Sequence, residues 1–135
     1  MVSEMNIGLD IDGTITAAPS FFSVISHALK KAGHKIYIIT HRFVDEKTLQ
    51  ELKDYNIFFH DIFSPDSIEV STVEKFDAWK GQKCRELNIN IWFEDDPRSI
   101  KHAPVTTHVF RSIDLSDTIG PTFEEIEEES NNSIH

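Results

Sequence analysis

Short apolar segments rich in β-branched residues alternate along the chain with longer segments in which apolar residues recur every three or four positions. The short segments predict strands and the longer ones predict helices. The five predicted strands cover residues 5–11, 35–40, 57–63, 89–93 and 105–110. Because these segments are apolar on both faces, they are typical of a parallel sheet covered by helices on both sides.

Local signals mark the ends of the predicted helices. The first should begin at Pro19 and end at Gly33, the second should be capped by Asp45, the third should cover residues 72–87, and the fourth should follow Asp96. This alternation predicts a Rossmann-like, open, doubly wound α/β domain with three layers (α/β/α) and a five-stranded parallel sheet. In such sheets ligands bind at the carboxyl ends of the strands.

The first helix carries an apolar stripe that we expect to face the sheet. Its members are Phe21, Val24, Ile25, Ala28, Leu29 and Ala32. The adjacent Phe21 and Phe22 have a second interpretation, as part of a site entrance or of a subunit contact. We expect at least one of the two rings to be buried.

The length of 135 residues corresponds to one ordinary domain. We expect residues 1–122 to form this domain and residues 123–135 to form an acidic tail. The net charge is -10, but residues 1–111 contain 13 basic and 16 acidic side chains, so most of the excess lies near the end of the chain. This acidity argues against tight binding to nucleic acid, which requires clustered Lys and Arg.

No segment has the length and apolar character of a membrane span or a secretory signal. The single cysteine, Cys84, cannot form an internal disulfide, which fits a reducing compartment. We therefore expect a soluble, cytoplasmic protein.

Two carboxylates stand at the end of the first predicted strand, where Asp-Ile-Asp-Gly-Thr begins at Asp10. Asp10 and Asp12 point the same way in an extended strand, and such a pair requires a cation or a shared proton. A calcium loop also begins with Asp-x-Asp, but here Gly13 is too early and Phe21 occupies the position of the bidentate Glu. A calcium loop is therefore excluded.

Polar residues also follow the second and fourth strands. Thr40 ends the second strand and is followed by His41 and Arg42. These two residues, together with Arg98 and His102, are candidates for substrate binding, and each has the alternative of being an exposed polar residue.

Three acids, beginning with Glu94, follow the fourth strand. They would face the first pair across the sheet edge, and all-oxygen ligation favours Mg²⁺. The last of them, Asp96, has the alternative role of capping the next helix.

Together these strand ends form an ordered series of motifs. The series consists of Asp10, Asp12, Gly13, Thr14, Thr40, a lysine before the fourth strand, Asp95 and Asp96. It resembles the haloacid dehalogenase superfamily of phosphohydrolases over residues 5–111. The resemblance implies the strand order 5-4-1-2-3.

The resemblance also implies residue roles. Asp10 corresponds to the nucleophile that becomes an aspartyl phosphate, and Asp12 to the general acid and base. Thr40 would donate a hydrogen bond to the phosphoryl group. The Mg²⁺ ligands would be Asp10, Asp12 through its backbone carbonyl, and Asp95, with Asp96 beside it.

The lysine of the series has three candidates, Lys75, Lys80 and Lys83. A cationic group is needed beside the nucleophile and the transferred phosphoryl group. We favour Lys80 because it lies fourteen residues before Glu94; Lys83, one helical turn later, has the alternative role of a solvated neighbour.

The intervals between the motifs leave no room for a cap domain. The protein therefore resembles the capless members of the superfamily, whose open sites tend to accept large substrates or gain a lid through oligomerisation. For this chain we expect a small-molecule or large phosphorylated substrate, and a homo-oligomer is worth testing. The function that we predict is a Mg²⁺-dependent phosphatase. Two alternatives stay open: phosphotransfer to an acceptor other than water, and a non-catalytic regulatory module that binds phosphate or metal.

Overall fold

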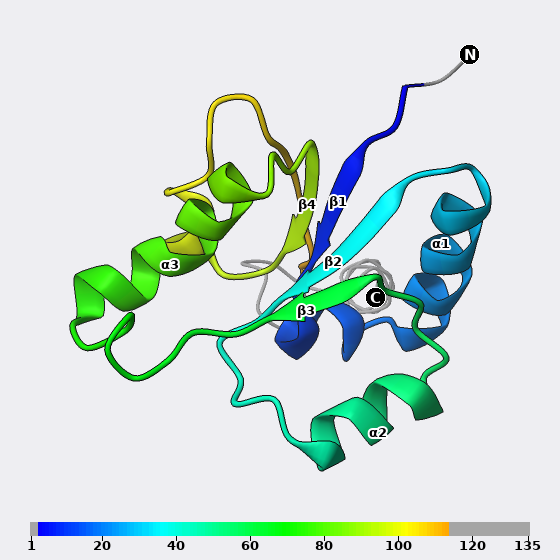
Figure 1. Ribbon diagram of the computed structural model, residues 1–135, viewed down its shortest axis with the longest axis horizontal. Helices are drawn as coiled ribbons and strands as arrows, with labels where there is room; N and C mark the ends of the chain where they lie inside the picture. The colour runs from blue at the N-terminus through cyan, green and yellow to red at the C-terminus, as the bar shows by residue number, and fades with distance from the viewer. Residues whose placement is uncertain (1–2, 114–135) are drawn as a thin grey trace, which may run out of the picture.

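The computed structural model describes residues 3–113, which form a five-stranded sheet between two layers of helices (Figure 1). The strands are β1 (Asn6–Leu9), β2 (Lys35–Ile39), β3 (Asp61–Phe63), β4 (Ile91–Glu94) and β5 (His108–Arg111). All neighbouring strands are parallel, and their order is β3-β2-β1-β4-β5. This is the predicted order read from the opposite edge, so the predicted α/β fold class is confirmed.

The helices begin where the local sequence signals place them. They are α1 (Pro19–Lys31), α2 (Glu46–Asp54), α3 (Val73–Glu86) and α4 (Pro97–Ile100). The Asp45 carboxylate accepts the Thr48 N–H at 2.8 Å at the start of α2, which satisfies one of the free amides of the first turn. Thr72 and Asp96 cap α3 and α4 in the same way.

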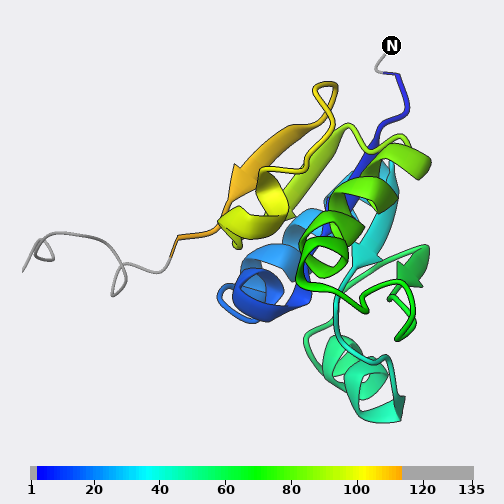
Figure 2. The same cartoon turned by 90° about the vertical axis from the view of Figure 1, so that its left-hand side faces the viewer.

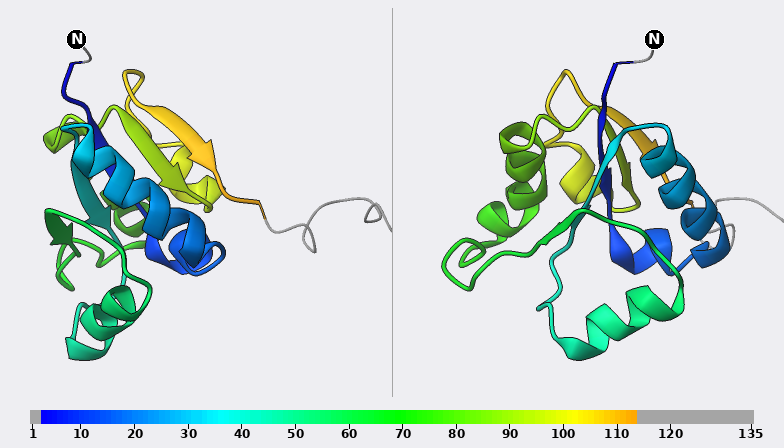
Figure 3. Two further views of the ribbon diagram at one scale, coloured as in Figure 1. Left: turned by 90° about the vertical axis from the view of Figure 1, so that its right-hand side faces the viewer. Right: turned by 45° about the vertical axis from the view of Figure 1, so that its right-hand side comes forward.

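Each face of the sheet has its own apolar core. Phe22 of α1 and Leu52 of α2 pack with residues of β1 and β2 on one face, and Trp79 and Cys84 of α3 pack with Trp92 of β4 on the other. Figures 2 and 3 show the resulting layers, with α1 and α3 on opposite sides of the sheet. The two cores fix the carboxyl ends of β1, β2 and β4 next to one another.

The two edge strands begin later than predicted. In the segment 57–63, only the last three residues form ladder pairs with β2. His60 donates its backbone N–H to the Ile36 carbonyl at 2.7 Å, but the Ile36 N–H is accepted by the His60 ring at 3.0 Å and not by a backbone carbonyl. At the other edge, a turn in which Thr107 donates its N–H to the Pro104 carbonyl delays the start of β5. An apolar segment predicts that a strand is present, but the residues at which the strand begins and ends depend on the neighbouring strand to which it is hydrogen-bonded.

The buried face of α1 differs from the predicted stripe. Phe22 is buried, whereas Phe21 is 51% exposed and Val24 is 72% exposed. Ser26 occupies a fully buried position because its hydroxyl donates to the Ser23 carbonyl at 3.1 Å and accepts the Phe58 N–H at 3.0 Å. Hydrogen bonding to a neighbouring loop thus buries a polar residue that lies outside the predicted apolar stripe.

The connections between the described strands contain the four α-helices, a short π-helical turn (Ile11–Ile15) directly after β1, and loops. No inserted cap domain is present among residues 3–113. The predicted boundary at residue 122 and the acidic tail lie outside the described residues. Within the described part, no helix is long and apolar enough to span a membrane.

Candidate active site

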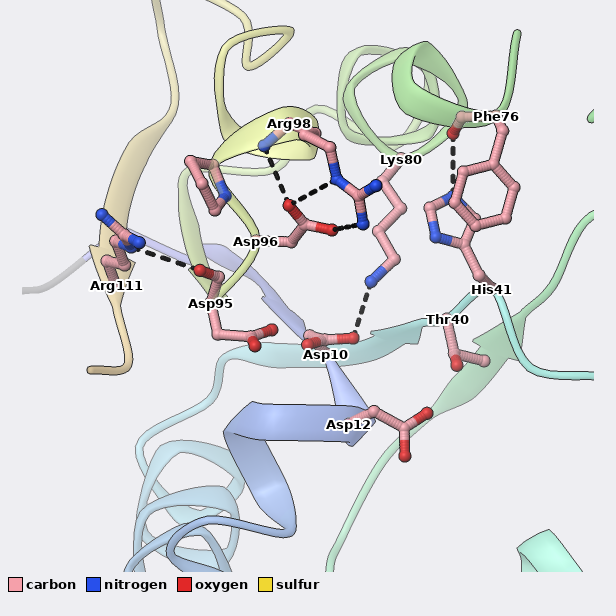
Figure 4. Close-up of a pocket in the computed structure, with 11 residues that line it drawn as sticks. Asp10, Asp12, Thr40, His41, Phe76, Lys80, Asp95, Asp96, Arg98 and Arg111 are labelled. Carbon is pink, nitrogen blue, oxygen red and sulfur yellow. Dashed lines mark hydrogen bonds and ion pairs between the residues drawn. The ribbon is translucent and has the colours of Figure 1, made fainter. Parts of the chain in front are cut away.

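An open cavity of about 450 Å³ lies at the carboxyl ends of the central strands (Figure 4). Eight of the ten predicted site residues line it, Arg42 contacts it through Asp12, and His102 lies outside the lining. The lining consists of Asp10, Asp12, Thr40, His41, Phe76, Lys80, Asp95, Asp96, Pro97, Arg98 and Arg111.

Asp10 follows β1 and is held from both sides of the sheet edge. Its backbone N–H donates to the Phe93 carbonyl at 3.0 Å, and the Thr14 hydroxyl donates to Asp10 Oδ2 at 3.1 Å. The residue is only 3% exposed. Its carboxylate therefore has a fixed position at the floor of the cavity.

Gly13 allows the chain to turn directly behind this carboxylate. Its φ of +80° lies in the left-handed region, and a Cβ at this position would collide with the Asp95 carboxylate. The Gly13 N–H donates to Thr16 Oγ1 at 2.9 Å, which closes the turn. Glycine is thus required both by the backbone and by the approach of Asp95.

We expect Gly13→Ala to lower the free energy of unfolding by about 1–3 kcal/mol and to weaken divalent-metal binding, because the new methyl group displaces Asp95. The matched control is Gly33→Ala: Gly33 also has a positive φ, of +94°, but a methyl group added there would meet no atom within 4 Å. It should show the backbone strain alone. Chemical denaturation and metal titration of both variants test this, and equal metal affinity in the two would contradict it.

Lys80 is the lysine that the structure brings to the site. It lies on α3, is 5% exposed, and its Nζ contacts Asp10 Oδ1 at 2.6 Å and Glu94 Oε1 at 2.7 Å. Lys83 instead pairs with Glu86 on the surface at 2.9 Å, and Lys75 is exposed at the start of α3. Burial alone would lower the pKa of Lys80, but its two carboxylate partners raise the pKa overall.

Glu94 was noted in the sequence as the first of three acids after the fourth strand, but it was given no role of its own. It is fully buried, and its second oxygen accepts the Asp95 N–H at 3.0 Å, so both oxygens are engaged. The alternation of β4 could have revealed it, because Glu94 follows the buried Trp92 by two residues and must share its face, which α3 covers. Glu94 therefore orients Lys80 and the chain that leads into Asp95.

Three carboxylates converge at the floor of the cavity. Asp10, Glu94 and Asp95 each offer an oxygen within 4.8 Å of the others. In the metal-free protein, burial and the nearby Glu94 raise the pKa of Asp10 to about 7 despite Lys80, and burial with the nearby Asp10 raises that of Asp95 to about 6. Three acids beside one ammonium leave excess negative charge, and a hard divalent cation fits this donor set.

Asp96 serves as a helix cap in this structure. Its Oδ1 accepts the Arg98 N–H at 2.9 Å, and its Oδ2 pairs with the Arg98 guanidinium at 3.0 Å. Hydrogen bonding to Arg98 lowers the pKa of Asp96. Its carboxylate lies outside the group of three convergent acids. The structure thus confirms the role of Asp96 as a helix cap, and a metal contact of Asp96 stays a prediction.

Arg42 is held by carboxylates of the protein. Its Nε and Nη2 bind the two oxygens of Asp12 at 2.8 and 2.6 Å, while Nη1 binds Glu51 Oε2 of α2 at 2.7 Å. This bidentate pair lowers the pKa of Asp12. In Figure 4 the Asp12 carboxylate points away from Asp10 and Lys80. Arg42 therefore positions Asp12, and substrate binding by Arg42 itself stays a prediction.

Thr40 and His41 end β2 beside Lys80. The Thr40 hydroxyl oxygen accepts the Arg42 N–H at 3.0 Å, which leaves its hydrogen available for a ligand. His41 is stacked on Phe76 with 3.8 Å between the ring centroids. Burial lowers the pKa of His41 to about 4, and the nearby Lys80 contributes to this shift.

Three lining residues lie outside the predicted ones. Pro97 begins α4, and the other two were missed by the sequence analysis. Phe76 faces the cavity from α3 beside His41, and Arg111 reaches it from β5, where its Nε donates to the Asp95 carbonyl at 3.2 Å. Neither belongs to a motif at a predicted strand end. Only the order of the strands, which places β5 beside β4, brings Arg111 to Asp95.

No known family description matches the chain, and no curated protein matches its sequence. Among solved structures, the chain is similar to the NMR structure of the core domain of a provisionally assigned phosphoglycolate phosphatase from Streptococcus pneumoniae TIGR4. The match has a TM-score of 0.47 and 16% sequence identity, and it covers 96% of this chain and 97% of the other. The assignment of the site therefore depends on the geometry of this chain's own residues.

Proposed function

We propose that the protein is a Mg²⁺-dependent phosphatase that hydrolyses a phosphomonoester through an aspartyl-phosphate intermediate. The observation that carries the proposal is the buried carboxylate of Asp10, which contacts the Lys80 ammonium at 2.6 Å and opens onto a cavity. A carboxylate is a weak nucleophile toward a phosphate dianion until cationic groups offset the repulsion. Lys80 supplies one such cationic group, and the convergent carboxylates of Asp10 and Asp95 would hold a divalent cation as the second.

The positions of Asp10, Thr40 and Lys80 support their proposed roles. The role of Asp12 comes from the resemblance of its motif, and it requires the Asp12 carboxylate to leave Arg42 and turn toward the leaving oxygen. An oxygen of Asp10 attacks phosphorus, the bond from phosphorus to the leaving oxygen breaks, and Asp12 protonates that oxygen. Water then attacks the aspartyl phosphate with Asp12 as the base, releasing phosphate and regenerating Asp10. The Thr40 hydroxyl and Lys80 donate hydrogen bonds to the phosphoryl oxygens.

Asp10, Asp95 and the backbone carbonyl of Asp12 are the groups that would hold Mg²⁺. Both oxygens of Glu94 are already engaged, so its part is to support Lys80 and Asp95. When bound, the cation supplies charge neutralisation of the phosphoryl oxygens. Because the pKa of Asp10 is about 7 without metal, we expect Mg²⁺ affinity to increase as the pH rises through 7.

The same residues support phosphotransfer to an acceptor other than water, and product analysis in the presence of alcohols distinguishes the two reactions. A regulatory module without turnover is the other alternative. It would bind phosphate or Mg²⁺ but release no product.

The direct test is hydrolysis of 4-nitrophenyl phosphate with Mg²⁺ or EDTA. Turnover that depends on the metal supports the proposal. Turnover that is equal in EDTA contradicts the role of the metal. No turnover of any phosphomonoester by the folded, Mg²⁺-loaded protein would favour the regulatory module, and beryllium fluoride would then show whether the site holds a phosphoryl mimic.

Asp95→Asn and Asp96→Asn form a matched pair for the metal site. We expect Asp95→Asn to weaken Mg²⁺ binding at least about tenfold because it removes a charged ligand. Asp96→Asn should change Mg²⁺ binding little, since asparagine retains the N-cap. Isothermal calorimetry on both variants measures the effect, and the reverse order would make Asp96 the ligand.

A further inference from the structure

His41 has one ring nitrogen engaged by the protein and one that is open. Its Nε2 lies 2.9 Å from the Phe76 carbonyl oxygen. Because a carbonyl oxygen can only accept, Nε2 must carry the hydrogen of this bond. The ring is further held by stacking on Phe76, with an interplanar angle of 21°. The orientation of the imidazole is therefore fixed by α3.

The other nitrogen, Nδ1, is then a hydrogen-bond acceptor. The burial of the ring and the nearby Lys80 ammonium both oppose a second proton and keep the ring neutral, with a pKa of about 4. Within residues 3–113, Nδ1 has no hydrogen-bond partner, and it is not among the buried polar atoms that lack one. Figure 4 shows Nδ1 on the side of the ring that faces Lys80 and the cavity.

This acceptor differs from the other polar groups of the cavity. Lys80, Arg98 and Arg111 are cationic donors. The Thr40 hydroxyl has a hydrogen to donate, and the lining carboxylates are engaged with cations or lie close to one another. The lone pair of Nδ1 repels any anionic group that the substrate carries besides its phosphate, and it can accept a hydrogen bond from an uncharged donor of the substrate. His41 directly follows Thr40, so the donor must lie close to the phosphoryl group that Thr40 is proposed to bind.

We propose that His41 is a specificity-determining residue whose Nδ1 accepts a hydrogen bond from a hydroxyl group near the phosphate of the substrate. This inference rests on the proposed function and narrows its substrate class to hydroxylated phosphomonoesters. A site that offers an acceptor to a hydroxyl group discriminates against the analogue that lacks it, because the acceptor is then left without a partner.

The kinetic test compares glycerol 1-phosphate with n-propyl phosphate, which share a carbon skeleton and differ in hydroxyl groups. We expect the wild-type protein to prefer glycerol 1-phosphate in kcat/KM by about tenfold or more. His41→Phe keeps an aromatic ring against Phe76 but removes the acceptor, so its ratio should fall to about one. An unchanged ratio in His41→Phe, or no preference in the wild type, would overturn the inference.

His27→Phe is the matched control. The His27 ring also contacts a backbone carbonyl, that of Asn56 at 3.1 Å, and lies near an aromatic ring, Phe58, but it is outside the cavity. Its substrate ratio should equal that of the wild type. Circular dichroism of both variants separates a loss of preference from a loss of fold.

A second measurement does not require turnover. Long-range ¹H–¹⁵N correlation spectra of the Mg²⁺-loaded protein at pH 7 should show His41 as the Nε2–H tautomer. An imidazolium or an Nδ1–H tautomer would overturn the inference.

Binding to the turnover-deficient Asp10→Asn variant completes the test. Adding glycerol 1-phosphate should shift the Nδ1 resonance of His41, and n-propyl phosphate should not. If the wild type hydrolyses no phosphomonoester at all, the proposed function fails, whereas the Nδ1 resonance still decides whether His41 selects the hydroxyl group. Equal responses to the two esters would contradict the selection.

Discussion

Replacing Asp10 with asparagine should reduce phosphomonoester hydrolysis at least about a thousandfold while leaving the fold intact. The amide oxygen of asparagine has nearly the same position as the carboxylate oxygen that contacts Lys80 at 2.6 Å, but it cannot form a stable phosphoryl intermediate. Burial of the neutral amide also costs less than burial of the ionised acid. Turnover should therefore be lost without a comparable loss of stability.

The pH dependence of stability provides an independent readout for the same variant. The pKa of Asp10 is raised from 3.8 to about 7 in the metal-free folded protein, so its contribution to stability is present below pH 4 and lost as the pH rises through 7. Asp10→Asn should remove this part of the decline. Thermal unfolding in EDTA between pH 5 and 8 measures it.

The control for Asp10→Asn is Asp54→Asn, which changes an exposed acid of α2 that bonds Gln50 at 2.8 Å. It should retain wild-type turnover. Activity of Asp10→Asn close to that of the wild type would exclude Asp10 as the nucleophile.

The parts of the fold that the sequence predicts well depend on local signals. Asp45, Thr72 and Asp96 begin α2, α3 and α4 because a side-chain oxygen must satisfy the free amides of a first turn. The strand order could not follow from such signals, and it came from the resemblance of the motifs. Edge-strand bounds and the face of α1 also escaped prediction, because they depend on the partner that each segment meets.

The same division applies to the site. Residues directly after a strand, such as Asp10 and Thr40, were predicted because parallel strands bring their carboxyl ends to one edge. Arg42 is predicted from its position as a substrate contact, because sequence cannot show that Glu51 and Asp12 already engage it. The part that Glu94 plays was not predicted because its pairing partner, Lys80, lies fourteen residues earlier on a different element.

Lys80→Ala should have a large effect on both turnover and stability. It leaves Asp10 and Glu94, which are 3% and 0% exposed, without their common cation. Removing one partner of a buried ion pair costs about 3–5 kcal/mol, because the remaining charge is buried and uncompensated. Turnover should fall as well, since no other lysine contacts Asp10 among the described residues.

Lys83→Ala is the control, because Lys83 lies on the same helix and pairs with Glu86 at the surface. Its effect on the free energy of unfolding should be about 0.5 kcal/mol or less, with turnover close to that of the wild type. Denaturation and steady-state kinetics on both variants give the comparison. If Lys83→Ala lost more turnover than Lys80→Ala, the role of the site lysine would pass to Lys83.

A double variant separates the two effects of Lys80. Lys80→Met with Glu94→Gln removes the cation together with one of the two buried acids, so stability should recover relative to Lys80→Met alone, whereas turnover should not. The remaining deficit of stability should be larger at pH 8 than at pH 5, because without the cation the already raised pKa of Asp10 rises further and its ionisation becomes costlier. Recovery of turnover in the double variant would mean that Lys80 serves only to neutralise Glu94. If only stability recovers, Lys80 has two separate roles. It balances the charge of Glu94 in the folded protein, and its ammonium acts directly at Asp10 during turnover, as the proposed mechanism requires.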